Sequence, residues 1–446
     1  MLEFANAALK FQVSISSFGA QRILGVLPLA NAEPVRSVQE TFYKAGEAAK
    51  KDFKANTALF GAFQFADKAQ SALASLASDA LSLRVLSPSY LAEMATGIAQ
   101  GSADAVGSVA TEEARRLLKK QFGNTFDVIG FVNHVDAPTR LSSEDGTYPL
   151  EAMVEKCYSH GDYPALWYVE GLGERYAEAY MENGKEVRDL LTSGKAAATD
   201  QKIQTMMHAG AGIAFAKHAV ANLTPWSADT EFRDALTEFL DLVRHNSIPG
   251  YEGAALESLG LVSRTWHGQL VSQISSHLLE VDADAFEFFW HGAGRAMYFS
   301  PMYMLPGLSP WDAADNEPPN ETACRNARAG VAWAFTIVNV RHPEIAANFL
   351  RYKGDRIAGN DAYTDGVYST LIMAGDMVPN HQYVSAFGRY HPDESDPAMV
   401  AAWTKHIGTE VEARVNSYRE KLKAHKKLGE VFRYHDLPRF IAALRD

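Results

Sequence analysis

The stretch His291-Gly-Ala-Gly-Arg-Ala-Met-Tyr-Phe299 decides the fold, because it places glycine and alanine among aromatic side chains in a segment that has helical character. Glycine in a helix interior costs about 1 kcal/mol relative to alanine, so its repeated use needs a compensating role. A helix surface without side chains lets the backbone of a neighbouring helix come close. We therefore expect a helix here that packs on its neighbours through small residues.

The same pattern recurs in six segments, in which a polar residue stands ahead of small residues. They read Glu170-Gly-Leu-Gly173, His208-Ala-Gly-Ala-Gly212, Glu257-Ser-Leu-Gly260, His291-Gly-Ala-Gly294, Arg328-Ala-Gly-Val-Ala332 and Asp365-Gly-Val-Tyr368. Gly171 and Gly292, in the first and fourth segments, are 121 residues apart. Gly210 and Gly330, in the second and fifth, are 120 residues apart. Repetition at a fixed spacing indicates an architecture built from repeats.

We therefore predict an all-α fold, with an amphipathic helical amino-terminal region followed by a pseudo-duplicated α-helical array. The halves of the array are placed at residues 163–280 and 284–400, with a basic terminal helix at 401–446. Its last 36 residues, from Val411, hold nine Lys or Arg and five Asp or Glu, which suits an exposed helix. Aromatic residues near the repeated glycines would fill the space beside them: Tyr176, Phe215, Trp266, Tyr298 and Trp333.

Glycine pairs after apolar residues also occur in dinucleotide-binding loops, which is the competing interpretation of these segments. That fingerprint needs a third glycine three residues after the second, for close packing of helix on strand. The residues at that position are Tyr176, Phe215 and Met297, all of them bulky. The pattern therefore favours helix packing over a nucleotide site.

Composition and charge set the class of protein. The chain has 446 residues, of which 47% are hydrophobic and 22% charged, as in ordinary globular proteins. A net charge of −12 repels phosphate backbones, so nucleic acid is not an expected partner.

The segment at residues 136–149 concentrates Pro, Ser, Asp and Gly, and we predict a linker there between an amino-terminal region at 1–135 and an array at 150–446.

The amino-terminal region has helical patterns at residues 34–53, 56–81 and 90–121. The third of these is crowded with Ala, Gly and Ser, which suits either an ordinary bundle helix or reversible adsorption to an apolar surface. The apolar run at residues 126–132 fits a strand or a buried helical turn.

The first 32 residues lack the basic leader and the long apolar run of a signal peptide, and no stretch holds the 18 or so apolar residues of a membrane span. We expect a cytoplasmic protein whose amino-terminal helices can lie on a lipid or granule surface.

The polar residues of the repeated segments are the candidate site. If the helices are equivalent, Glu170, Glu257, His291 and Asp365 occupy equivalent positions and can converge on one cavity, joined by His208 and Arg295. Carboxylates and imidazoles that meet in this way can bind a ligand, hold a metal or exchange protons. The alternative is that they face solvent or form packing ion pairs with arginines elsewhere in the array: Arg175, Arg264 and Arg328.

Familiar catalytic motifs are absent from the sequence. It has no His-Glu-x-x-His, no Gly-x-Ser-x-Gly, no phosphate-binding loop and no Cys-x-x-Cys. Cys157 and Cys324 are its two cysteines, which allows one bridge at most, and a buried, inert thiol is the expected state of Cys157. The sequence therefore names neither a reaction nor a cofactor, and it predicts no metal.

His291-Gly-Ala-Gly-Arg-Ala-Met-Tyr-Phe299 and Arg328-Ala-Gly-Val-Ala-Trp-Ala334, followed by the tract at residues 361–375, resemble a bacterial family of unknown function found beside enediyne biosynthesis genes. The resemblance covers residues 150–435 and brings no established catalytic residues. Separately, residues 4–79, with Gly61-Ala-Phe-Gln-Phe-Ala-Asp67, are similar to granule-associated phasins.

The two resemblances imply different functions. The first implies an accessory protein of specialised metabolism that holds an apolar small molecule, such as an acyl or polyene chain. The second implies a non-enzymatic scaffold that adsorbs to lipid or polymer. Neither indicates an oligomeric state.

Overall fold

The computed structural model describes residues 112–133, 135–142, 146–184, 187–299, 309–354, 357, 361–379 and 382–444. The chain divides into two compact units, residues 1–115 with 301–305 and residues 116–300 with 306–446. Nearly all of the first unit lies outside the described residues, as do the helices predicted at 34–53 and 56–81, most of the one at 90–121, and the phasin-like segment. The division falls at residue 115, ahead of the linker predicted at residues 136–149.

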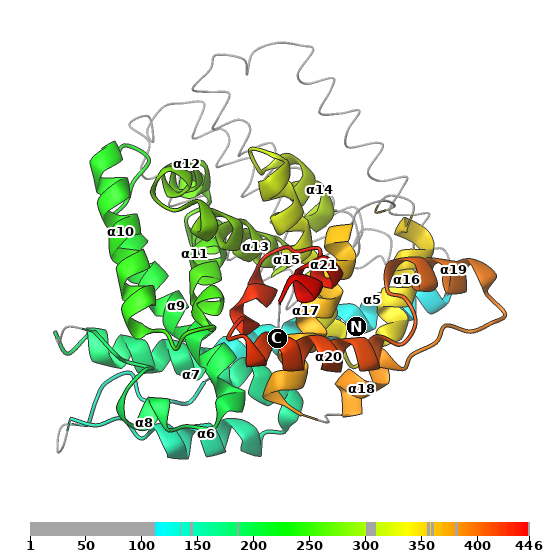
Figure 1. Ribbon diagram of the computed structural model, residues 1–446, viewed down its shortest axis with the longest axis horizontal. Coiled ribbons are helices and arrows are strands. Elements are labelled where there is room, and N and C mark those ends of the chain that lie inside the picture. Colours follow the sequence, from blue (N-terminus) through cyan, green and yellow to red (C-terminus); the bar gives the residue numbers. More distant parts are fainter. Residues whose placement is uncertain are drawn as a thin grey trace, which may run out of the picture. The chain divides into compact units, whose positions relative to one another are not determined.

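Every regular element in the described part of the chain is a helix, which confirms the all-α class. The six repeated segments lie in α7 (Asp162–Met181), α9 (Gln204–Val220), α11 (Glu252–Trp266), α13 (Ala283–Phe299), α15 (Glu321–Asn339) and α17 (Asp361–Met377). We call these the inner helices, and each packs most closely on the next one along the chain. Between them run four outer helices: α10 (Asp229–Asn246), α12 (Val271–Val281), α14 (Ser309–Asn316) and α16 (Pro343–Lys353). Figure 1 shows α10, α12 and α14 outside the row formed by α9, α11, α13 and α15.

The other elements lie at the two ends of this array and in its connections. They are α5 (Glu112–Asn133), α6 (Leu150–Ser159), α8 (Gly194–Ala197), α18 (Gln382–Gly388), α19 (Pro397–His406), α20 (Val411–Ala424) and α21 (Leu437–Ala443), with short 3₁₀ turns η1 (Gln201–Ile203), η2 (Gly268–Leu270) and η4 (Leu428–Phe432). Residues 126–132 belong to α5, so the helical alternative holds there and the strand does not.

The inner helices are buried on nearly all faces, whereas the outer helices are buried on one face. In α9 almost every side chain is buried, including polar ones such as Thr205. In α10 the buried residues recur at intervals of three and four, for example Phe232, Leu236, Phe239 and Val243, and the other face is exposed. A helix that is apolar all round belongs in a core, whereas an amphipathic one covers it. The array is therefore two layers deep.

The inner helices pack on one another through a repeated register. We call position p the residue directly before the first glycine or serine of each segment: Glu170, Ala209, Glu257, His291, Ala329 and Asp365. A Cβ atom added to the glycine at p+1 would overlap the carbonyl oxygen of position p in the preceding helix, and this holds for Gly210, Gly292, Gly330 and Gly366. At the remaining interface, the p+1 residue Ser258 instead donates a hydrogen bond to the position-p oxygen of Ala209 at 2.8 Å.

The second small residue completes each interface from the other side. A Cβ on the glycine at p+3 would overlap the backbone of the residue at p−2 in the following helix, as found for Gly173, Gly212, Gly260 and Gly294. The glycines therefore serve close approach of backbones, as the sequence predicts. The spatial repeat is one inner helix, and the larger duplication into two halves stays a prediction.

Different elements close the two ends of the row. At the first end, Gly171 of α7 faces the Val132 carbonyl oxygen, 3.2 Å from an added Cβ, and the Val135 side chain, so the end of α5 and the residues after it stand where a preceding helix would. At the last end, position p+3 of α17 is Tyr368, whose hydroxyl donates to the Ile407 carbonyl at 3.0 Å. A bulky residue there directs the chain to a different packing partner.

The row also curls back on itself. The Tyr163 hydroxyl of α7 donates to the Val338 carbonyl near the end of α15 at 3.0 Å. The rings of Trp167 and Phe299, on α7 and α13, lie 6.4 Å apart. The first inner helix therefore lies against the fourth and fifth, and the faces that carry position p are turned inward.

One of the five predicted space-filling aromatic residues lies elsewhere. Tyr176, Phe215, Tyr298 and Trp333 are buried, but Trp266 is 55% exposed. Trp266 is the last residue of α11, beyond the region where α11 meets its neighbours. Its ring contacts the Lys217 ammonium group instead, at 5.1 Å from the ring centre.

Candidate functional site

Four of the six candidate residues meet in one buried group, which we call the buried cluster: Glu170, Glu257, His291 and Arg295. Glu257 accepts two hydrogen bonds. His291 Nδ1 donates to its Oε1 at 2.6 Å, and an Arg295 guanidinium nitrogen donates to its Oε2 at 2.6 Å. The other terminal nitrogen of Arg295 donates to Glu170 Oε1 at 3.0 Å. All four residues are at most 3% exposed. The cluster ties α7, α11 and α13 together.

The repeated register explains why these residues meet. Glu170, Glu257 and His291 stand at position p of their helices, and Arg295 is one turn further at p+4, on the same face as His291. Position p of α9 is Ala209, which brings no polar group to this face. The curl of the row then brings α7 within reach of α13.

Burial and mutual attraction set the protonation of the cluster. Burial raises the pKa of Glu170, and the charge of Arg295 offsets part of this rise. Burial alone would lower the pKa of Arg295, but the two carboxylates outweigh it and the net pKa is raised. Two carboxylates against one guanidinium leave one negative charge in excess. Because an unbalanced buried charge is costly, a further anion is disfavoured beside the cluster.

Three nitrogen atoms at the cluster have no hydrogen-bond partner within the described part of the chain: His291 Nε2, Arg295 Nε and Trp333 Nε1. The Arg295 guanidinium lies over the Trp333 ring at 4.4 Å, and the His291 ring stands edge-on to it at 6.5 Å. A buried polar group left unpaired costs about 1–3 kcal/mol. Such groups are usually satisfied by a water, an ion or a ligand.

A carboxyl-terminal segment covers the cluster. We call residues 428–436 the strap; it contains η4 and leads into α21. The Phe432 ring is fully buried, 6.5 Å from His291 and 5.8 Å from Trp333. Sequence reasoning did not identify Phe432, since a single aromatic residue in a basic tail carries no signal of its own.

His208 does not join the cluster, contrary to the prediction. It stands at p−1, because Ala209 is the residue that occupies position p in α9. Its Nδ1 lies 2.6 Å from the Gln204 carbonyl, and its Nε2 accepts the Ile248 amide at 2.9 Å. Burial lowers its pKa to about 4, so the ring is neutral and holds the connection between α10 and α11.

Asp365 occupies position p of α17, as predicted, but it forms its hydrogen bond with the strap. Its Oδ1 accepts the His435 amide at 3.4 Å, and its Oδ2 has no partner among the described residues. Burial raises the pKa of its carboxyl well above the usual range.

The three arginines expected to form packing ion pairs with the candidates pair with other residues. Arg175 binds Glu178, Arg264 binds Glu317, and Arg328 binds Asp315, at 2.7, 2.8 and 2.6 Å. Among the described residues, Arg295 is the arginine that pairs with the carboxylates of the cluster.

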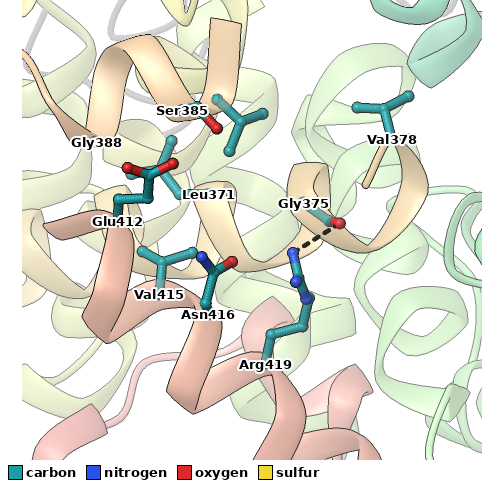
Figure 2. A pocket seen from close by; sticks show the side chains of 10 residues that line it. Leu371, Gly375, Val378, Ser385, Gly388, Glu412, Val415, Asn416 and Arg419 are labelled. Carbon is teal, nitrogen blue, oxygen red and sulfur yellow. Dashed lines mark hydrogen bonds between the residues drawn. The ribbon is translucent and has the colours of Figure 1, made fainter. Parts of the chain in front are cut away.

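A small pocket of about 50 Å³ lies between α17, α18 and α20, apart from the cluster. Figure 2 shows its lining, in which Arg419 reaches the Gly375 carbonyl while Glu412 and Ser385 stand on the other side. That volume holds a few water molecules. None of the six candidate residues lines it.

In the described ranges no group of three His, Cys, Asp or Glu residues is arranged to hold a metal ion. Cys157 and Cys324 are both free and buried, and burial raises the pKa of Cys157 to about 12, which makes it a poor nucleophile. No helix among the residues described is long and apolar enough to cross a membrane.

Comparison with known proteins found no family model, no curated protein and no solved structure that matches the chain significantly.

Proposed function

We propose that the helical array binds an apolar small molecule, such as an acyl or polyene chain, as an accessory protein of bacterial specialised metabolism. The observation that carries the proposal is the set of three unpartnered nitrogens on His291, Arg295 and Trp333. They lie beside the aromatic rings of Trp333 and Phe432. Apolar walls with a few polar groups that fix orientation are typical of small-molecule sites.

The charge of the cluster selects the polar end of the ligand. A carboxylate would add a second negative charge to a buried group that already has one in excess, at a large desolvation cost. A neutral hydroxyl or carbonyl oxygen instead accepts hydrogen bonds from Arg295 and Trp333 without adding charge. We therefore propose a neutral, oxygen-bearing ligand.

A proton-transfer role is a second candidate, favoured by the Glu257–His291 pair. A carboxylate bound to Nδ1 orients an imidazole and leaves Nε2 to act as a base. This arrangement would withdraw the proton of a bound hydroxyl group. The alternative of a phasin-like scaffold stays a prediction, because the amino-terminal helices lie outside the described residues.

Ligand binding is tested with the full chain, by native mass spectrometry of the purified protein and by titration with 1-decanol and decanoate. We expect a copurifying species or saturable decanol binding, with decanoate weaker at pH 8. Trp333→Phe removes one N–H donor and is expected to weaken decanol binding about fivefold.

The matched control is Trp290→Phe. Trp290 is also buried, but its Nε1 already donates to Ser275 Oγ at 2.9 Å, so its loss should leave the Kd of decanol unchanged. Absence of any bound species, together with no saturable binding of either probe, would reject the proposed function.

A further inference from the structure

The strap is attached in turn to four inner helices. Just before α11, the Gly429 amide donates to the Gly250 carbonyl at 2.6 Å, and Gly429 lies so close to Gly253 of α11 that neither position has room for a side chain. At α13, Arg433 pairs with Asp284 at 3.2 Å. The strap thus begins on α11 and passes across α13.

Its second half continues in the same direction. The Tyr434 amide donates to Asn326 Oδ1 of α15 at 2.7 Å, and the His435 amide donates to Asp365 Oδ1 of α17 at 3.4 Å. Phe432 of the strap packs against His291 and Trp333, which carry two of the unpartnered nitrogens, and the His435 amide bonds to Asp365, whose Oδ2 is also unpartnered among the described residues. The strap therefore contacts three side chains that have unsatisfied polar atoms.

The attachment of the strap differs from that of the helices beneath it. Leu428, Val431 and Phe432 are buried, but Lys427, directly before the strap, and Asp436, its last residue, are exposed. Lys426 has φ of 52°, a backbone conformation that non-glycine residues rarely adopt. A short segment held by a few amide bonds between two exposed ends can open without unfolding the helices.

We propose that the strap is a cover that opens to admit the ligand to the buried cluster, with Phe432 leaving the space above His291 and Trp333. The strap then regulates access to the ligand site. This regulatory role rests on the proposed function. Opening exposes His291 Nε2, which has no hydrogen-bond partner among the described residues.

The experiment measures that exposure directly in the full chain. Diethyl pyrocarbonate acylates an accessible imidazole nitrogen, and peptide mass spectrometry gives the rate at each histidine. His208 is an internal reference, because it is equally buried and both of its ring nitrogens are hydrogen-bonded. We expect His291 to react at least tenfold faster than His208.

Asn326→Ala leaves the Tyr434 amide without its acceptor and should raise the His291 rate about fivefold. The matched control is Asn246→Ala. Asn246 is likewise buried, accepts the Leu190 amide at 2.8 Å and donates to the carbonyl four residues earlier, but it holds a different loop. It should leave the ratio of the two rates unchanged.

Equal, slow modification of His291 and His208 in the unchanged protein and in both variants would overturn the proposal that the strap opens. The two histidines would then be exposed only by global unfolding. Faster His291 modification in Asn326→Ala, with protection by 1-decanol, supports both the cover and the ligand site. The same acceleration without any decanol binding supports the cover and rejects the proposed function.

Discussion

Replacing Gly260 by alanine tests whether the repeated glycines hold the inner helices together. Gly260 is on α11, and an added Cβ would lie 2.7 Å from the Phe289 carbonyl carbon and 2.8 Å from the Ala293 nitrogen, and closer still to the Phe289 oxygen. All of these atoms are backbone, so no side-chain rotation relieves the overlap. The two helices must separate by an ångström or more.

Two opposing effects decide the magnitude. Alanine stabilises a helix interior by about 1 kcal/mol relative to glycine. A gap of 0.5–1 Å already forfeits about a quarter to a half of the dispersion energy across an interface, and overpacking of a core costs about 1–3 kcal/mol, occasionally more. Because the obstacle is a backbone, we take the upper end and expect Gly260→Ala to lower the free energy of unfolding by about 2–3 kcal/mol.

Urea unfolding followed by circular dichroism measures this change. Gly123→Ala is the matched control, because Gly123 is also within a helix but has open space where its Cβ would be. We expect that variant to be unchanged or stabilised by up to about 1 kcal/mol. If Gly260→Ala is as stable as the control variant, close backbone packing is not the reason for glycine at this position.

Three further predictions concern buried side chains. Glu257→Gln should destabilise the protein by about 1–3 kcal/mol in urea unfolding, because it weakens the charge-assisted hydrogen bonds that Glu257 accepts from His291 and Arg295; an unchanged free energy of unfolding would contradict that role of Glu257. The pKa of His208 is lowered to about 4, so the unfolded chain binds more protons between that value and about 6.5. Stability is then fully present above pH 6.5 and is lost as the pH falls, by about 2 kcal/mol between pH 7 and 5, and His208→Gln should flatten this dependence. Trp333→Ala should cost about 3–5 kcal/mol and Trp266→Ala less than about 0.5, and equal losses would contradict their different burial.

The inner helices could be predicted because glycine in a helix interior has a cost that only packing explains. The segments around Gly171, Gly210, Gly292, Gly330 and Gly366 all lie where a neighbouring backbone approaches. The register within the segment around His208 was not predictable in the same way. It contains four small residues in a row, and sequence alone does not say which of His208 and Ala209 is equivalent to Glu170.

The meeting of Arg295 with Glu170 depends on geometry that sequence does not carry. These residues are 125 positions apart, and they meet because the row of inner helices curls back until α7 lies against α13. The cover over the cluster was missed for a related reason. Phe432 and Asn326 are unremarkable in their local sequence, and their roles arise from the path of the carboxyl-terminal segment.

The row of inner helices also has a consequence for the order of folding. Each interface joins helices that are neighbours in the chain, so helix pairs can form early and at low loop-closure entropy, as in repeat proteins. The contacts of Arg295 with Glu170 and of Tyr434 with Asn326 span 125 and 108 residues, and they form only after the row has assembled. These long-range contacts join helices that are distant in the chain. We therefore expect the array to unfold in one cooperative transition. An open row of repeats would instead lose its terminal helices first.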